Sequence, residues 1–262
     1  MPTAPIRDLM MYYEEQGTGE PLVLILGAGG DLQAWAFQVP ALAQGFRVIT
    51  FDNRGAGRTS APDRPYTIAQ MADDLAGLLD HLKVTKAHIL GHSMGGAVAQ
   101  EFALKYPARV NKLILVSTAA SFDGATANLV KSWVDVRRSN MSREQVARMT
   151  ANWLYSAELL DDPARFEGSI KNSLANPYPQ PDHAFIRQAQ AVLAFDTRRR
   201  AAAIKAPTLV LAGREDILVP PGRSEKLAAL IPGAKSQTLS GGHVGIVEFA
   251  GEYNVAILAF LK

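Results

Sequence analysis

Residues 87–95 read Ala87-His88-Ile89-Leu90-Gly91-His92-Ser93-Met94-Gly95. The apolar segment 86–90 is typical of a buried parallel strand, and the small and apolar residues of 96–104 are typical of a helix packed on a sheet. The Gly-x-Ser-x-Gly pattern between them predicts a sharp strand-to-helix turn, on which larger side chains at Gly91 or Gly95 would collide with neighbouring backbone. We therefore expect Ser93 to project alone into a cleft.

Composition sets the class of protein. A chain of 262 residues with 48% hydrophobic and 20% charged residues is long enough for one single-core domain. Lys+Arg 27 against Asp+Glu 25 is nearly balanced, so we expect no nucleic-acid partner. No run approaches the ~20 apolar residues of a membrane span, and no signal peptide is recognisable, so we expect no membrane partner and a cytoplasmic location. The absence of cysteine excludes thiolate nucleophiles and Cys-ligated metals.

Strand-like and helical patterns alternate, which predicts the α/β class with a mostly parallel central sheet flanked by helices. Strands are expected at residues 21–26, 46–51, 86–90, 112–117, 208–212 and 235–239, and helices at 35–44, 68–82, 96–104, 222–230 and 253–261. From 118 to 205 the pattern is helical and interrupted by prolines. We expect a core domain of residues 1–117 and 206–262, with residues 118–205 as a helical cap inserted between two strands.

A serine hydroxyl is a weak nucleophile without a base and an acid that orients the base. His243 lies in a glycine-rich loop after the last expected strand, where ligands bind in open α/β sheets. Asp216 ends the loop after the strand at 208–212. The chain order Ser93, Asp216, His243 matches that of one known triad architecture. The alternatives are a capping role for His243, and Glu215 as the acid, although Glu215 is expected to face solvent or pair with Arg214.

The developing charge on an attacked carbonyl oxygen requires two N–H donors. Met94 N–H, directly after the serine, is one candidate, and Ala28 N–H in the loop 27–30 is the other. That loop is rich in glycine and so could instead cradle a phosphate. However, it has neither the Gly-x-Gly-x-x-Gly spacing nor the Lys-Ser/Thr pair of a P-loop.

Together the loops 27–30, 51–60, 91–96, 213–220 and 242–243 resemble those of the α/β-hydrolase superfamily over nearly the whole chain. The resemblance implies an α/β-hydrolase fold and a structural role for the 52–60 loop, where Arg54 would bind backbone or carboxylate groups. One departure is Leu26-Gly27, where the family usually has His-Gly, and this bears on the rigidity of the loop. Ser117 occupies the position where some relatives carry the acid, which leaves that role to Asp216.

The resemblance implies attack of Ser93 on an acyl carbon, with His243 as base, Asp216 fixing its tautomer, and no cofactor or metal. We expect a small ester or lactone substrate, apolar or aromatic, because the cap offers apolar and aromatic side chains. Segments 31–35 and 66–75 are also similar to those of enol-lactone hydrolases of aromatic degradation. The candidate substrate-binding residues are Gly29, Trp133, Trp153, Tyr155 and Val244. Aromatic residues at helical spacing, as in the cap, are more often core packing than pocket lining. Cofactor-free perhydrolases, carbon–carbon bond hydrolases, dioxygenases and slowly hydrolysing ligand receptors share this fold, and a homodimer remains open.

Overall fold

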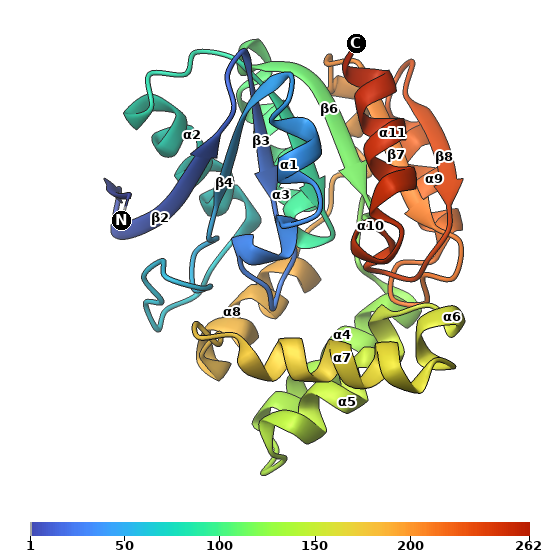
Figure 1. The fold of residues 1–262 in the computed structure, drawn as a ribbon. Helices are drawn as coiled ribbons and strands as arrows, with labels where there is room; N and C mark the ends of the chain where they lie inside the picture. Colours follow the sequence, from blue (N-terminus) through green and yellow to red (C-terminus); the bar gives the residue numbers. More distant parts are fainter. Residues whose placement is uncertain (1) are drawn as a thin grey trace.

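The computed structural model of the protein describes residues 2–262, and within them eight strands form one sheet in the order β1-β2-β4-β3-β5-β6-β7-β8. Strand β2 pairs antiparallel with β1 and β4, and the other neighbours are parallel. The α/β class with a mostly parallel sheet is confirmed (Figure 1). The strands are β1 (Thr3–Ile6), β2 (Leu9–Gln16), β3 (Glu20–Ile25), β4 (Phe46–Phe51), β5 (Ala87–His92), β6 (Val110–Val116), β7 (Thr208–Gly213) and β8 (Lys235–Leu239).

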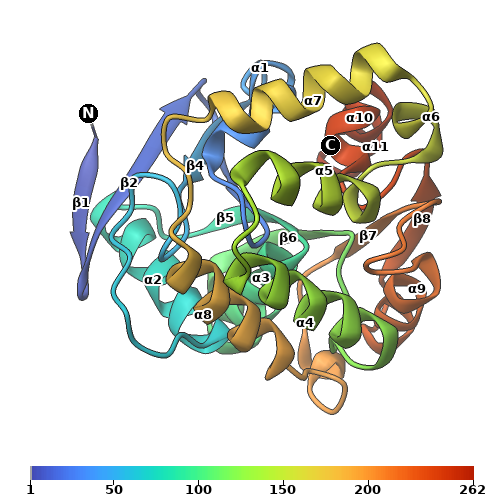
Figure 2. The same ribbon diagram turned by 90° about the horizontal axis from the view of Figure 1, so that it is seen from below.

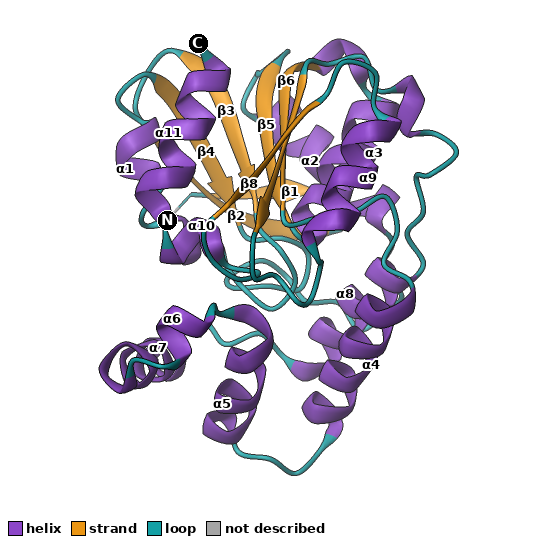
Figure 3. Ribbon diagram, turned by 90° about the vertical axis from the view of Figure 1, so that its right-hand side faces the viewer, coloured by secondary structure: helices purple, strands orange, loops and turns teal. Residues whose placement is uncertain are grey.

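Helices cover both faces of the sheet because successive strand side chains point to opposite faces. Val23 and Ile25 belong to the core under α2, α3 and α9, whereas Leu22 and Leu24 belong to the core under α1 and α11. The two groups of helices lie on opposite sides of the strands (Figure 3). Their bounds are α1 (Val39–Leu42), α2 (Ile68–His81), α3 (Met94–Lys105), α9 (Pro221–Leu230), α10 (Gly245–Glu248) and α11 (Ala250–Leu261), with single 3-10 turns η1 (Leu32–Trp35), η2 (Pro107–Arg109) and η3 (Ala201–Ala203).

The cap follows β6 and precedes β7, and it lies across the carboxyl ends of the strands (Figures 1 and 2). Its helices are α4 (Gly124–Arg138), α5 (Arg143–Leu154), α6 (Ala157–Leu160), α7 (Pro163–Ala175) and α8 (Asp182–Leu193). Side-chain amides of the cap reach core backbone: Gln188 Nε2 donates to Arg54 O at 2.8 Å, and Gln180 Nε2 donates to Gly55 O at 2.9 Å. The cap is therefore docked on the loop after β4. Among residues 2–262, no helix has both the length and the apolar character needed to span a membrane.

Two parts of the sequence-based assignment differ from the structure. The sequence did not predict the antiparallel strands β1 and β2. Of the two, only β1 is an edge strand, and neither strand is marked by a continuous apolar run, so their order comes from pairing with their neighbours. The single helix expected at 35–44 is wrong. Residues 32–35 form η1 and α1 covers only Val39–Leu42, because Pro40 lacks an N–H and fits only the first turn of a helix.

Arg54 holds the loop after β4 through buried ion pairs. Its guanidinium donates from Nε and Nη2 to Asp74 on α2, both at 2.8 Å, and from Nη1 and Nη2 to Asp8, also at 2.8 Å. Arg54 is 1% exposed and Asp74 is 2% exposed. Burial raises the pKa of the Asp74 carboxyl, and the hydrogen bonds from Arg54 oppose that rise. The role of Arg54 as a carboxylate-binding structural residue is confirmed.

Replacing Arg54 by methionine should lower the free energy of unfolding by about 3–5 kcal/mol, because the buried Asp74 carboxylate loses its hydrogen-bonding partner and keeps only the exposed Arg7 at 3.6 Å. Urea denaturation measures the change. Asp8→Asn is the matched control. The Asp8 side chain is 29% exposed, so its loss should cost only about 1 kcal/mol. Equal losses in the two variants would contradict the buried-charge explanation.

Candidate active site

Ser93 stands on a strained turn between β5 and α3. Its backbone has φ 55° and ψ −119°, a left-handed conformation that costs a non-glycine residue about 1–3 kcal/mol. Its N–H donates to Val116 O at 2.9 Å, and its carbonyl accepts from Thr118 Oγ1 at 2.8 Å. A Cβ at Gly95 would meet the backbone of Ile25 far inside normal contact distance. The turn is therefore fixed from both sides, and the Ser93 side chain points toward the cap.

Ser93, His243 and Asp216 form one hydrogen-bonded chain. His243 Nε2 lies 2.9 Å from Ser93 Oγ, and His243 Nδ1 lies 2.9 Å from Asp216 Oδ2. Because a carboxylate only accepts, Nδ1 carries the proton, which leaves Nε2 free to accept from the Ser93 hydroxyl. His243 and Asp216 are 3% and 2% exposed, so this pair is shielded from water, whereas Ser93 is partly exposed. The structure brings together the three residues that the sequence singled out.

The second carboxylate oxygen of Asp216 fixes its orientation. Oδ1 accepts from Leu218 N at 3.0 Å and from Val219 N at 2.8 Å, which leaves Oδ2 for His243. The neighbouring Glu215 is exposed, as expected. Its Oε2 also accepts from Ala157 N at 2.8 Å, at the start of α6, a contact with the cap that the sequence did not indicate.

Ala28 and Met94, the expected oxyanion donors, both line the cavity at Ser93. Met94 is the first residue of α3, so its N–H has no acceptor within the helix. The next N–H of the loop after β3 is already used, because Gly29 N donates to Gln188 Oε1 of the cap at 3.4 Å. The arrangement leaves the Ala28 and Met94 amides for a ligand oxygen.

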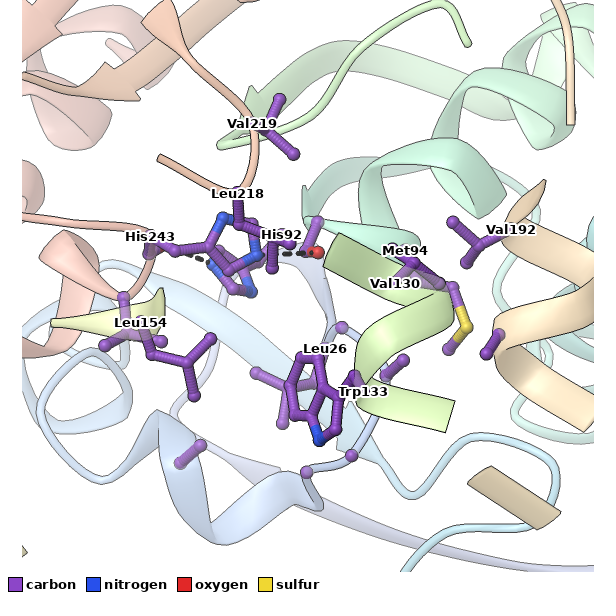
Figure 4. A pocket seen from close by; sticks show the side chains of 18 of the residues that line it. Leu26, His92, Met94, Val130, Trp133, Leu154, Val192, Leu218, Val219 and His243 are labelled. Carbon is purple, nitrogen blue, oxygen red and sulfur yellow. Dashed lines mark hydrogen bonds between the residues drawn. The ribbon is translucent and has the colours of Figure 1, made fainter. Parts of the chain in front are cut away.

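An apolar cavity of about 190 Å³ lies between Ser93 and the cap (Figure 4). Its walls come from the core loops and from α4, α5 and α8, and include Leu26, Val130, Trp133, Leu154, Phe185 and Leu218. Of the expected substrate-binding residues, Gly29, Trp133 and Val244 line it, whereas Trp153 and Tyr155 do not. Trp153 packs edge-on against Trp133 with ring centroids 6.3 Å apart, so it supports the wall from behind.

A second, polar cavity of about 230 Å³ adjoins the apolar one under the cap. The two share Gly29, Trp133, Leu154 and Phe185 as lining residues, and Arg137 and Arg143 line the polar one. The guanidinium of Arg137 lies 5.0 Å from the centre of the Phe185 ring. Space for a ligand therefore extends from an apolar end at Ser93 toward a polar end beneath α5.

Known proteins are similar to this chain in sequence and in fold. A family model described as alpha/beta hydrolase fold matches residues 20–250. The chain belongs to the α/β-hydrolase family. The protein named "Putative carbamate hydrolase RutD" of Azorhizobium caulinodans is 32% identical over 264 residues, which cover 99% of this chain and 98% of that protein.

Solved structures of other α/β hydrolases are similar over the same length. The enol-lactonase from Burkholderia xenovorans LB400 has a TM-score of 0.89 at 28% identity and covers 99% of both chains. A hydrolase from Pseudomonas aeruginosa PA01 has a TM-score of 0.90 at 32% identity, covering 100% of this chain and 98% of that one. This protein is thus a hydrolase of the α/β fold.

His92 is a residue of this hydrolase that the sequence reasoning missed. It lines the cavity beside Ser93, and its Nε2 lies 2.9 Å from His243 O. A carbonyl only accepts, so Nε2 carries the proton. Burial, and then the neighbouring His243, lower the pKa of His92 to about 4. His92 is therefore neutral at pH 7 and holds the backbone of His243 without competing with it as a base.

The depressed pKa of His92 makes the protein less stable in acid. Unfolded, His92 binds a proton below about pH 6.5, whereas folded it does so only near pH 4, so acid favours the unfolded chain. The free energy of unfolding should fall by about 3 kcal/mol as the pH drops through this window. Urea denaturation near pH 7 and near pH 4.5 should show this loss in the wild type and in His81→Gln, an exposed control, but not in His92→Gln. The same loss in all three would contradict the assignment.

Proposed function

We propose that this α/β hydrolase cleaves a small, apolar carboxylic ester or lactone through an acyl-enzyme on Ser93. The observation that carries the proposal is the Ser93–His243–Asp216 chain opening into an apolar cavity. The Ser93 hydroxyl would attack the substrate carbonyl carbon while His243 Nε2 takes its proton. The resulting oxyanion would accept hydrogen bonds from the Ala28 and Met94 amides.

Collapse of this tetrahedral species expels the alcohol, which receives the proton from His243. Water then attacks the acyl carbon of the ester to Ser93, and His243 takes a proton from that water. Breakdown releases the carboxylic acid and returns the proton to Ser93 Oγ. Asp216 stays ionised throughout and stabilises the imidazolium, because His243 Nδ1 donates to its Oδ2 at 2.9 Å.

The cavity supports the choice of substrate. An apolar protein cavity of ~150 Å³ holds a benzene ring, so about 190 Å³ suits a ring or a short acyl chain and excludes a long one. A carboxylate in this cavity would be desolvated among apolar side chains, without a cation to pair with. A polar substituent on the departing alcohol could instead extend into the cavity that Arg137 lines. A neutral carbamate ester, suggested by the name of the RutD relative, has a similar shape and is a second carbonyl class to test.

A panel of p-nitrophenyl esters tests the proposal. We expect multiple turnovers, with kcat/KM for the butyrate at least about tenfold above that for the dodecanoate, which is too long, and for the hydrogen succinate, which is charged. The N-alkyl carbamate of the same phenol and a set of lactones complete the panel. One turnover followed by arrest, with a change in cap position, would favour a ligand receptor. Turnover only with peroxide or dioxygen present would favour a perhydrolase or dioxygenase.

A further inference from the structure

The cap segment 154–157 is bound to the loops that carry His243 and Asp216. Leu154 O accepts from Val244 N at 3.1 Å. The backbone N and the Oγ of Ser156 donate to Glu248 Oε1 at 2.9 and 2.7 Å. Ala157 N donates to Glu215 Oε2 at 2.8 Å. The core partners of this short segment therefore lie within five residues of His243 or directly beside Asp216.

Glu248 connects the two sides of this contact. While Oε1 accepts from Ser156 in the cap, Oε2 accepts from Gly242 N at 3.0 Å, one residue before His243. The carboxylate is half-buried, whereas Ser156 is fully buried. The groups that face the two carboxylate oxygens of Glu248 are all hydrogen-bond donors. Residue 248 must therefore present an acceptor oxygen on both sides.

The backbones on the two sides also touch. A Cβ at Gly242 would lie 2.6 Å from Leu154 O and 2.7 Å from Tyr155 C, which leaves no space between the cap and the His243 loop. The loop is tied in turn to the Asp216 loop, because Glu215 N donates to Gly241 O at 3.0 Å. Movement of residues 154–157 away from the core would therefore pull on the backbone at both Gly242 and Val244, the neighbours of His243.

We propose that Glu248 is a positioning residue that couples the docked position of the cap to the placement of His243 against Ser93. The inference rests on the proposed acyl-enzyme function. It adds that displacement of the cap at residues 154–157 moves His243, the proposed base, away from its position against Ser93. Glu248 does not touch the cavity and is not a lining residue. It acts on the reaction through the His243 loop alone.

Glu248→Gln is the sharpest test because it keeps the shape of the side chain. The amide has one acceptor oxygen, so either Gly242 N or Ser156 N loses its acceptor and faces an N–H donor instead. We expect kcat for p-nitrophenyl butyrate to fall about 10- to 100-fold, with KM nearly unchanged, because the cavity is intact and the base is displaced. Glu252→Gln is the matched control. Glu252 accepts from Ser240 N at 3.3 Å on the same loop, and among residues 2–262 it makes no hydrogen bond to the cap, so the kcat of this variant should stay at the wild-type value.

Ser156→Ala tests the cap side without altering the His243 loop. It removes only the Oγ bond to Glu248, so we expect a smaller loss in kcat, and the double variant with Glu248→Gln should be no slower than Glu248→Gln alone. If Glu248 had only a structural role, its substitution would lower the melting temperature, and kcat measured well below the melting temperature would be unchanged. Additive losses in kcat, or an unchanged kcat in Glu248→Gln, would overturn the inference.

Hydrogen exchange provides a readout that does not depend on activity. In Glu248→Gln, amide exchange should accelerate together in the cap segment 151–158 and in the loop 239–246, and it should stay at the wild-type rate in Glu252→Gln. Acceleration in one segment only would mean that the two are not coupled, even if Ser93 is the nucleophile. Conversely, joint acceleration in a protein that cleaves none of the esters would retain the coupling and reject the proposed function.

Discussion

Ser93→Ala is expected to lower kcat for p-nitrophenyl butyrate by about 10⁵- to 10⁶-fold. Without the hydroxyl no acyl-enzyme forms, and His243 has no proton to take from residue 93. A residual rate above that in buffer should remain, because the Ala28 and Met94 amides and the apolar cavity are retained. The measurement is single-turnover and steady-state release of p-nitrophenol.

The fold should not change in this variant. Among the described residues, the Ser93 hydroxyl bonds to His243, and its removal leaves the turn and the glycines around it as they are. Melting temperature and circular dichroism are therefore expected to match those of the wild type. A Ser93→Ala protein that is folded and still turns over within tenfold of the wild type would place the nucleophile elsewhere.

Asp216→Asn should lower kcat by about 10⁴-fold while leaving the protein folded. Oδ1 of residue 216 accepts from the amides of Leu218 and Val219, so the asparagine must keep its oxygen there and present its NH₂ group to His243. His243 Nδ1 would then have to accept, which moves the ring proton to Nε2. In that tautomer the imidazole can no longer receive the proton of Ser93.

Glu225→Gln is a suitable control for this experiment because Glu225 is an exposed carboxylate of the nearby helix α9. It should change kcat less than twofold. If Asp216→Asn were equally mild, the base would be oriented by some other group, and Asp216 would serve only to hold the backbone of residues 218–219.

The catalytic loops could be predicted from the sequence because their backbones leave few choices. Few folds contain a serine in a left-handed conformation between glycines, directly after a buried strand. Few folds also place an acid and a histidine in the loops after later strands of the same sheet. The choice of Asp216 over Glu215 as the partner of His243 could also be predicted. The role of Glu215 could not, since its partner, Ala157 N, lies 58 residues away in the cap.

The lining of the cavity could not be predicted in the same way. Trp133 and Trp153 are both aromatic residues of cap helices, yet only the first lines the apolar cavity, because the choice depends on how α4 and α5 pack. The apolar residues that follow Asp216 could have indicated part of the lining. Leu218 donates its N–H to Asp216 and also lines the cavity. The position of His92 could not be predicted either, because adjacent residues on a tight turn usually point in different directions, yet His92 and Ser93 line the same cavity.

The most direct test of the central claim is covalent labelling with an organophosphate such as diethyl p-nitrophenyl phosphate, followed by peptide mass spectrometry. Tryptic cleavage after Lys86 and Lys105 places Ser93 in a peptide that has no other hydroxyl side chain. We expect one phosphoryl group per chain, carried on that peptide, with ester hydrolysis lost in proportion to labelling. Stoichiometric labelling of another peptide, or full activity in a protein whose Ser93 is fully labelled, would contradict it.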